Sequence, residues 1–484
     1  MIFISNIVSD AQRAFGLNSV PVSGDFYTDR IALCNSIYSG DPPWRYVRKS
    51  GLYGKGYRRM SMLNCAKVLC DNLAQLTFSN QVDISSANSA HYDFIMTVLQ
   101  ENGFWSNMPS FLSKAYALGG GAVKVLISDK RILLDYVDAL SFVPCGYSGR
   151  GITEGIFENR FAKGGHCYTL LEKHGIENNH AVCDRALFTS DNGTLERQIP
   201  VSDMFPGLEE HSEYYRISAP LFAYFRSAEA NNFDSDSVLG ISCFANCIDT
   251  LQALDVAFDS FSREFVLGRK RIIVPSSCIR TIVDPDTGKI SRYFDSDDEV
   301  YQALKCDEER DLKITDNTTE LRVTEHVDAL NSLLDIHCFQ TGLSSGTLSF
   351  SSTSGVKTAE EIKSRETRTE LTMQNNRNLA AELIETTCVN ILRAGMAAGL
   401  IPEEEISVTV RFSDKQTIDT DTVIDRNIRL VEAGLKSPVT AIKELYDCSE
   451  SEAEAELSRV ADPAPAVFRR QLDVMNCGSK LTDG

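Results

Sequence analysis

Residues 239–272 read LGISCFANCIDTLQALDVAFDSFSREFVLGRKRI. Positions 241, 244, 248, 251, 255, 258, 262 and 265 follow the three- and four-residue spacing of one helix face, and all but Asp255 and Ser262 are apolar. The pattern predicts one helix from Ser237 to Leu267, about 45 Å long. Gly268 and the basic run 269–271 suit the end of that helix, where positive charge meets the negative end of the helix dipole.

Two more helices follow in the chain. The first is predicted from near Thr324, as its N-cap, to Thr341, and the second from Thr358 to Gly395. Between them, residues 342–355 read GLSSGTLSFSSTSG, which predicts a flexible loop with apolar tips. The first half of the last helix, residues 363–378, is polar nearly all round, so it needs a second surface, which we expect from a neighbouring subunit.

The rest of the chain alternates helix and strand. Residues up to about 236 predict an α+β region. It begins with a short amphipathic helix, followed by turn-rich, aromatic sequence over 25–60, helices over 62–76, 89–101 and 108–118, and strands from Ala122 to about Ile199. Strands are also predicted over 272–274, 279–283 and 290–294, the last two joined by a hairpin turn at 284–288. A strand over 406–412 and short helices over 420–460 precede a tail that we expect to be disordered.

Composition limits the class of protein. The 484 residues allow about three domains. Lys and Arg number 48 against 67 Asp and Glu, a net charge of −19, which argues against a surface that binds nucleic acid or anionic membrane all over. The fourteen cysteines form no Cys-x-x-Cys pair and fit buried thiols in a reducing compartment. The sequence shows no apolar run of membrane-spanning length and no basic leader, so we expect a soluble protein made in the cytoplasm.

The order of these elements resembles the portal proteins of tailed double-stranded-DNA bacteriophages, of the type found in long-tailed phages of Gram-positive hosts. The resemblance covers nearly the whole chain. Five segments carry it: LGISCFANCID (239–249), FVLGRKRI (265–272), LRVTEH (321–326), GVKTAEEI (355–362) and ALGGGAVK (117–124). Two long helices bracket a small β-rich insert, a Ser/Gly-rich loop follows, and a longer helix comes next.

The resemblance implies an α+β portal fold that assembles as a dodecameric ring around a DNA channel. It assigns residues 1–236 to the wing, 237–268 and 324–341 to the stem helices, 269–323 to the clip, 342–357 to the tunnel loop, 358–415 to a long wing and crown helix with its returning strand, 416–461 to the crown and 462–484 to a flexible tail.

Site residues follow from the same assignment. The tunnel loop would face DNA through Ser344, Ser345, Thr347, Ser349, Phe350, Ser351, Ser352 and Lys357. The stem would face the channel through Asp249, Asp259 and Arg263, and would pack between subunits through Ile241, Phe244, Ile248, Leu251, Phe258 and Phe265. The clip would bind the motor or adaptor through Arg269, Lys270, Arg271, Asp284, Asp286, Lys289 and Arg292.

The implied partners are other copies of the chain, double-stranded DNA in transit, the terminase large subunit, a head-completion or adaptor protein, and the major capsid and scaffolding proteins. The implied location is the portal vertex of the virion, after assembly in the host cytoplasm. The resemblance implies no catalytic residue, metal or cofactor. An acidic channel suits this role, because each bound Lys or Arg would add affinity that resists the movement of DNA.

Two sequence features each allow two interpretations. Lys357 is predicted either to contact the phosphates of DNA or to pair with Glu360 or Glu361. Residues 44–59 hold six basic residues, four aromatics and no acid, which fits a nucleic-acid surface or, as we favour, arginines paired with acids of the same or a neighbouring subunit.

An enzyme is the alternative from another class. The histidines and cysteines His166, Cys167, His174, His180 and Cys183 have the residue types of a metal site but not the spacing of a closed zinc module. We therefore favour residues of a β-meander, with buried cysteines and histidines at turns, over a cytoplasmic metal-dependent enzyme built on the strands of 120–200. Asp284, Asp286 and Asp295 fit a hairpin turn better than a calcium loop.

No phosphate-binding P-loop occurs in the sequence, so a separate motor would supply the work of moving DNA. Another connector ring of the virion is the remaining alternative, and it would lack the long helix after residue 358.

Overall fold

The structure is a computed structural model, which describes residues 7–17, 24–51, 54–78, 82–128, 131–149, 151–191, 194–215, 217–235, 237–268, 272–273, 280–283, 290–293, 315–316, 320–350, 359–412, 420–446 and 450–461. The chain divides into two compact units, Met1–Phe412 and Ser413–Gly484. Among the described residues, no helix is both long enough and apolar enough to span a membrane.

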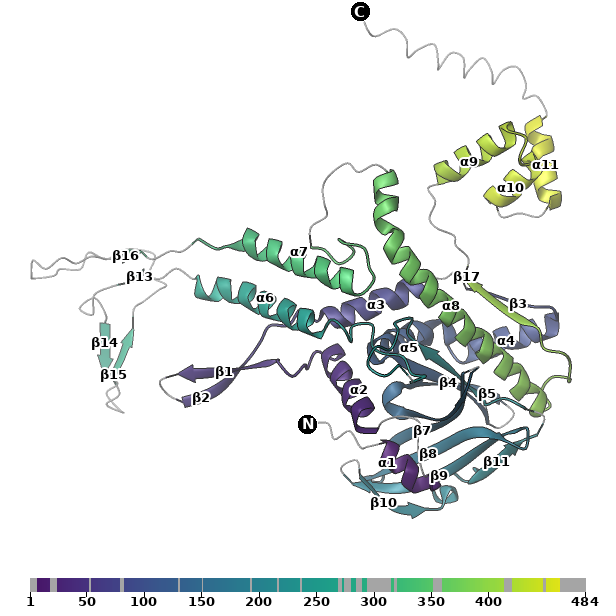
Figure 1. The fold of residues 1–484 in the computed structure, drawn as a ribbon, viewed down its shortest axis with the longest axis horizontal. Helices are drawn as coiled ribbons and strands as arrows, with labels where there is room; N and C mark the ends of the chain where they lie inside the picture. The colour runs from purple at the N-terminus through teal and green to yellow at the C-terminus, as the bar shows by residue number, and fades with distance from the viewer. Residues whose placement is uncertain are drawn as a thin grey trace, which may run out of the picture. The chain divides into compact units, whose positions relative to one another are not determined.

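The first unit is built on a helical layer and two antiparallel sheets (Figure 1). Helices α3 (Cys65–Thr77), α4 (Ser89–Glu101) and α5 (Phe104–Leu118) pack with the long α8 (Ala359–Ala397) in the main core. The sequence predicted all four helices. The apolar stripe in the second half of α8 is confirmed as core, because Leu383, Ile384, Cys388, Ile391 and Leu392 are all buried.

A three-stranded sheet lies against this layer in the order β12 (Phe222–Arg226), β4 (Gly120–Ser128), β5 (Arg131–Asp138). A larger meander follows in the order β10-β9-β8-β7-β6, with β11 paired to β9. Its strands are β6 (Phe142–Ser148), β7 (Gly151–Lys163), β8 (His166–Glu177), β9 (His180–Asp191), β10 (Thr194–Ile199) and β11 (His211–Tyr214). Short 3-10 turns are η1 (Ala139–Ser141) and η2 (Val201–Asp203). Strands β3 (Val82–Ser86) and β17 (Val408–Phe412) form a separate pair.

The N-terminal segment holds one element that the sequence predicted and one that it did not. The amphipathic α1 (Ile7–Phe15) buries Ile7, Val8 and Ala11, as predicted. Residues 25–60 were expected to be turn-rich, but α2 (Gly24–Tyr38) occupies the first part, and Ile31, Cys34 and Ile37 are buried at a helical three-residue spacing. A hairpin of β1 (Tyr46–Gly51) and β2 (Gly54–Arg59) follows.

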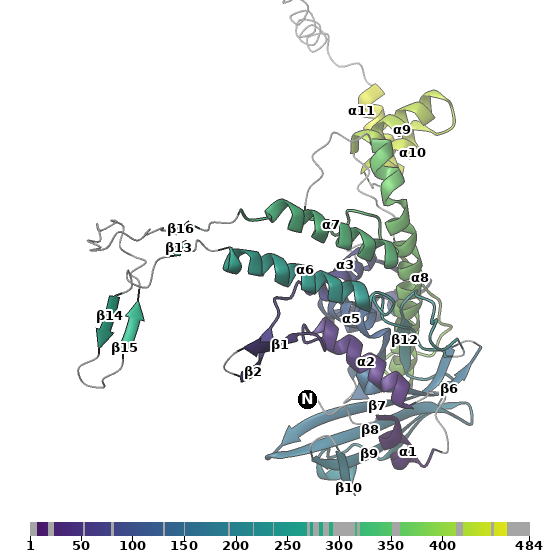
Figure 2. The ribbon, with the colours of Figure 1, turned by 60° about the vertical axis from the view of Figure 1, so that its left-hand side comes forward.

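Two neighbouring helices extend from this body: α6 (Ile248–Leu267) and α7 (Val323–Gln340) (Figures 1 and 2). Helix α7 matches its prediction closely, although its N-cap is Arg322 rather than Thr324. Helix α6 is shorter than predicted. Residues 237–247 were expected to be helical, but they form turns, and the amide of Cys243 donates to the carbonyl of Tyr116 at 3.0 Å.

The reason for the shortened helix is a backbone crossing. A Cβ atom added to Gly240 would lie 2.2 Å from the carbonyl oxygen of Gly119, and one added to Gly119 would lie 2.7 Å from that of Gly240. Gly119 also has a φ of +93°, which favours glycine. A tertiary contact therefore overrides the helical spacing over 237–247.

The insert between α6 and α7 is described only in short pieces. Strands β14 (Arg280–Val283) and β15 (Ile290–Tyr293) pair antiparallel, as predicted, and β13 (Ile272–Ile273) pairs with β16 (Thr315–Asp316). The predicted turn at 284–288 lies outside the described residues. The second unit contains α9 (Thr420–Glu432), α10 (Pro438–Tyr446) and α11 (Glu450–Ala461), which fits the short helices predicted there.

Candidate functional site

Helix α6 is fixed on one side by two buried acids one turn apart. Asp255 accepts hydrogen bonds from the indole of Trp44 at 2.9 Å and from the amide of Leu63 at 3.0 Å. Asp259 accepts two hydrogen bonds of 2.6 Å from the guanidinium of Arg58. These bonds tie the base of the β1–β2 hairpin to α6.

The two carboxyl groups differ in their pKa shifts. Burial raises the pKa of Asp255, which has no cationic partner among these contacts. The hydrogen bonds from Arg58 lower the pKa of Asp259, which therefore stays ionised.

The opposite side of α6 contacts α7. Thr250 donates to the side-chain carbonyl of Gln340 at 2.7 Å, and the ring of Phe261 lies 5.8 Å from that of His326. Near the far end of the pair, Arg322 donates to Glu264 at 3.1 and 2.9 Å. Those bonds lower the pKa of Glu264 to about 2.

The predicted channel-facing residues differ in their exposure. Asp259 was expected on the polar side, but only 5% of it is exposed and it is bound by Arg58, because the hairpin covers this side of α6. Asp249 is exposed and Arg263 is half-buried, and their channel role stays a prediction. The sequence carried a signal for the covered side: Asp255 stands inside the apolar stripe, one turn before Asp259.

The residues predicted to pack between subunits divide into two groups. Ile241, Phe244 and Leu251 are buried in the chain's own core, so the prediction is wrong for them. Ile248 and Phe258 pack partly against that core. Phe265 is 46% exposed, which makes it the most exposed member of the set.

The loop after α7 is partly structural. Leu343 and Leu348 were expected as apolar tips, but both are buried in the main core. Ser344 was predicted to face DNA, but it is buried, and its amide donates to the hydroxyl of Thr369 in α8 at 2.8 Å. Contacts of this kind give the polar first part of α8 a surface within the same chain, where we had expected a neighbouring subunit to provide it.

The remaining loop residues keep their predicted role as a hypothesis. Ser345, Thr347, Ser349 and Phe350 are exposed. Ser351, Ser352 and Lys357 lie outside the described residues.

Most of the predicted clip residues lie outside the part of the chain that the structure describes. Arg269, Lys270, Arg271, Asp284, Asp286 and Lys289 lie outside the described residues, and Arg292 is placed only as a backbone position in β15, paired with Thr281. Their proposed contacts with a motor or an adaptor stay predictions.

The basic and aromatic stretch 44–59 pairs in part with acids of its own chain. Arg58 binds Asp259, and Arg45 binds Asp41 at 2.8 Å. Arg48 and Arg59 are exposed instead, beside the exposed rings of Tyr46 and Tyr57. The interpretation that we favoured is thus confirmed for two arginines of the hairpin region.

A buried charge cluster crosses the two sheets. Lys124 of β4 lies 2.9 Å from Glu172 of β8 and 2.9 Å from Asp135, and Arg185 of β9 donates to Glu172 at 3.1 Å. Burial would raise the pKa of Glu172, but Lys124, His174 and Arg185 outweigh it and bring the pKa to about 2. The acid is therefore a counter-ion for two cations.

Only part of the predicted histidine and cysteine group meets. His174 and Cys183 lie 3.5 Å apart, and with Glu172 they have the spacing of metal ligands. Glu172 is already bound by two cations, so a divalent cation would meet repulsion there. His166 and Cys167 are exposed at the start of β8, and His180 lies at the start of β9. The predicted placement is wrong for His174, which is buried, and for Cys167, which is not.

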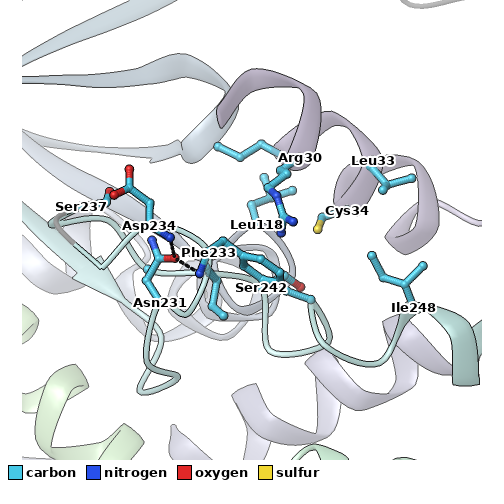
Figure 3. Close-up of a pocket in the computed structure, with 14 residues that line it drawn as sticks. Arg30, Leu33, Cys34, Leu118, Asn231, Phe233, Asp234, Ser237, Ser242 and Ile248 are labelled. Atoms are coloured by element: carbon cyan, nitrogen blue, oxygen red, sulfur yellow. Dashed lines mark hydrogen bonds between the residues drawn. The ribbon is translucent and has the colours of Figure 1, made fainter. Parts of the chain in front are cut away.

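A cavity of about 180 Å³ lies between α2 and the segment before α6 (Figure 3). Apolar side chains such as Leu33, Leu118 and Ile248 line it, and the guanidinium of Arg30 lies 3.4 Å from the ring centre of Phe233. Burial raises the pKa of the Cys34 thiol to about 11, so this thiol stays protonated at neutral pH and is not activated as a nucleophile.

Comparison with known proteins gives the family. The model of the family described as "Phage portal protein, SPP1 Gp6-like" matches residues 54–462. No curated protein sequence matches the chain. A solved structure titled "Virion of native gene transfer agent (GTA) particle" is 11% identical, with a TM-score of 0.44, over 91% of this chain and 99% of that one.

The match covers most of the chain and includes the hairpin's second strand, both sheets, α6, α7 and α8. The family is one of structural proteins of the phage virion. The chain therefore belongs to the SPP1 Gp6-like phage portal proteins.

Proposed function

We propose that copies of this portal protein close into a dodecameric ring at one capsid vertex, through which double-stranded DNA is packaged and later ejected. Exposed apolar side chains on the α6–α7 pair carry the proposal. Val256, Phe265, Val266 and Leu267 on α6 are 46–57% exposed, and Ile336 and Phe339 on α7 are 48% and 65% exposed. Such a group is unfavourable in water, and contact with identical copies would cover it.

Within the ring, residues 1–236 form the wing, 237–268 and 324–341 the stem, 269–323 the clip, 342–357 the tunnel loop, 358–415 the long wing and crown helix with its strand, and 416–461 the crown. The body of the helical layer and sheets supports the wing assignment, and the neighbouring α6 and α7 support the stem. The exposed Ser345, Thr347 and Ser349 offer weak hydrogen bonds to a DNA backbone of any sequence.

The clip then contacts the terminase large subunit during packaging and a head-completion or adaptor protein afterwards. The major capsid and scaffolding proteins surround the wing. ATP hydrolysis belongs to the separate motor, and the portal itself acts without catalysis. The net charge of −19 supports a channel that lets DNA move without holding it.

The oligomeric state tests the proposal. Size-exclusion chromatography with light scattering is expected to give a species of about twelve chains, and electron micrographs down its axis should show a central pore. A stable monomer both in solution and in the particle would refute the ring.

A variant sharpens that test. Phe265→Asp places a charge on the exposed end of α6 and is expected to reduce assembly while the thermal melting of the subunit stays unchanged. Phe244→Asp is the contrasting variant, since burial of a charge in the chain's own core should unfold the subunit itself.

A further inference from the structure

The β1–β2 hairpin has two faces of different character. Tyr46 pairs with Arg59, Val47 with Arg58, and Arg48 with Tyr57. Paired residues share a face and successive residues alternate, so Tyr46, Arg48, Tyr57 and Arg59 lie on one face, and Val47 and Arg58 on the other. Arg58 binds Asp259, which directs the second face toward α6.

The first face, called here the outer hairpin face, is uncovered in the single chain. Tyr46 is 57% and Tyr57 75% exposed, and Arg48 and Arg59 are exposed as well. In the part of the chain that the structure describes, neither Arg48 nor Arg59 forms an ion pair. A two-stranded hairpin alone is only marginally stable, so a partner on this face would stabilise it.

Helix α6 separates the hairpin from α7. Asp255 and Asp259, which bind the hairpin segment, lie on one side of α6, and Thr250, Phe261 and Glu264, which contact α7, lie about half a turn away around the helix. Figures 1 and 2 show the same order, with α7 above α6 and the hairpin below. The hairpin and α7 therefore lie on two sides of α6, and each can present a separate surface to another copy of the chain.

An exposed side of α7, about a quarter turn around the helix from the residues that contact α6, has the complementary chemistry. Glu325, Asp328, Ser332 and Ile336 follow the three- and four-residue spacing of one helix face, and all four are exposed. We call this set the acidic α7 face. Its carboxylates suit the two arginines of the outer hairpin face, and Ile336 offers apolar area to a tyrosine ring.

We propose that the outer hairpin face of one copy docks on the acidic α7 face of the next copy. The proposal rests on the proposed ring. Two different and complementary faces of one chain make a head-to-tail contact, and such contacts close into rings when the rotation allows. Tyrosine and arginine are also the side chains that are most enriched among energetically important interface residues.

Double-stranded DNA is the other occupant that a basic face could take. The acidic α7 face favours a second copy, because DNA binding gives no reason for a matching acidic stripe on α7. DNA binding is therefore an outcome of the test below.

Two charge-reversed variants test the docking. Variant one is Arg48→Glu with Arg59→Glu, and variant two is Glu325→Lys with Asp328→Lys. In each variant alone, like charges meet at every contact, so the high-mass species should be lost. In an equal mixture, the acidic hairpin of variant one meets the basic α7 of variant two, and the unchanged faces meet as in the wild type. Assembly should therefore return in rings of alternating subunits, as measured by sedimentation velocity.

The matched control is Arg131→Glu with Arg197→Glu, a pair of exposed arginines on the sheets, which should assemble as the wild type does. Thermal melts of each separate variant establish that the subunit folds.

Assembly of both variants at the wild-type level would overturn the docking and leave the ring standing. Failure of the mixture to reassemble would also overturn it. A wild-type chain that stays monomeric would refute the ring and the docking together. DNA binding is tested with a 30-base-pair duplex, a probe of about three helical turns. If variant one forms intact rings that no longer bind this duplex, the outer hairpin face binds DNA instead.

Discussion

The ammonium group of Lys124 lies 2.9 Å from a carboxylate oxygen of Glu172 and is almost completely buried, with 2% of the residue exposed. This pair joins the three-stranded sheet to the meander, because Lys124 lies on β4 and Glu172 on β8.

Lys124→Met is therefore expected to lower the free energy of unfolding by about 3 kcal/mol, since it leaves a buried carboxylate short of a partner. Urea unfolding measures the loss. Lys114→Met is the control: Lys114 pairs with Asp138 at the surface, where a salt bridge is worth about 0–1 kcal/mol. Equal losses in the two variants would contradict the role given to burial.

Acid is expected to destabilise the subunit in two steps. Burial lowers the pKa of His174 and of His337 to about 4, so both stay neutral in the fold and gain a proton on unfolding. Stability is full above the unfolded histidine pKa of about 6.5 and is lost as the pH falls toward 4. Glu172, with its pKa of about 2, adds a further loss between about pH 4.5 and 2.

His337→Leu tests the first step, because both ring nitrogens of His337 lack a hydrogen-bond partner in the described structure. The variant should show a smaller fall in melting temperature between pH 6.5 and 4 than the wild type. Exposed His166→Leu is the control and should keep the wild-type slope. An unchanged slope in the His337 variant would refute this explanation.

The crossing of Gly119 and Gly240 predicts intolerance to any side chain. Gly240→Ala would place its methyl group against the carbonyl of Gly119, so we expect a loss of at least about 3 kcal/mol of stability and a lower melting temperature. Gly149→Ala is the matched change, because a Cβ atom there meets nothing within 4 Å, and it should melt with the wild type. A tolerated alanine at 240 would mean that the two backbones can separate.

The loop after α7 should divide into a structural and a functional part. Leu343→Ala is expected to cost about 2–5 kcal/mol, because the side chain is fully buried, whereas Phe350→Ala should cost less than about 0.5 kcal/mol. Deletion of residues 350–354 should then leave assembly intact and reduce DNA packaging in an in vitro packaging assay. Normal packaging by that deletion would refute the tunnel-loop assignment.

The sequence predicted the fold class, α7, α8 and the hairpin of β14 and β15 because each depends on a local pattern. The stripe Leu383, Ile384, Cys388 and Ile391 has its apolar residues where a buried helix face needs them. The same reasoning failed over 237–247, where the spacing is helical but a backbone contact with Gly119, 121 residues earlier in the sequence, takes precedence.

Burial of the candidate site could not be predicted for a related reason. An apolar stripe indicates that a helix face is covered, but it does not say by which chain. Phe244 and Leu251 looked like contacts between subunits and are intramolecular, whereas Asp259 looked like a solvent-facing acid and is bound by Arg58, 201 residues earlier. Such pairings depend on tertiary structure, for which no local spacing gives evidence.

The glycine crossing has a mechanical consequence. A side chain that separates two segments can change its rotamer when the segments move. At the crossing of Gly119 and Gly240 the two backbones are in direct contact, without a side chain between them. Residue 240 lies eight residues before α6 begins, and residue 119 lies immediately before β4. The crossing therefore joins the segment that leads into α6 directly to the segment that leads into β4, and the Lys124–Glu172 pair joins β4 to the meander. A displacement of α6 has a continuous path of direct contacts to both sheets.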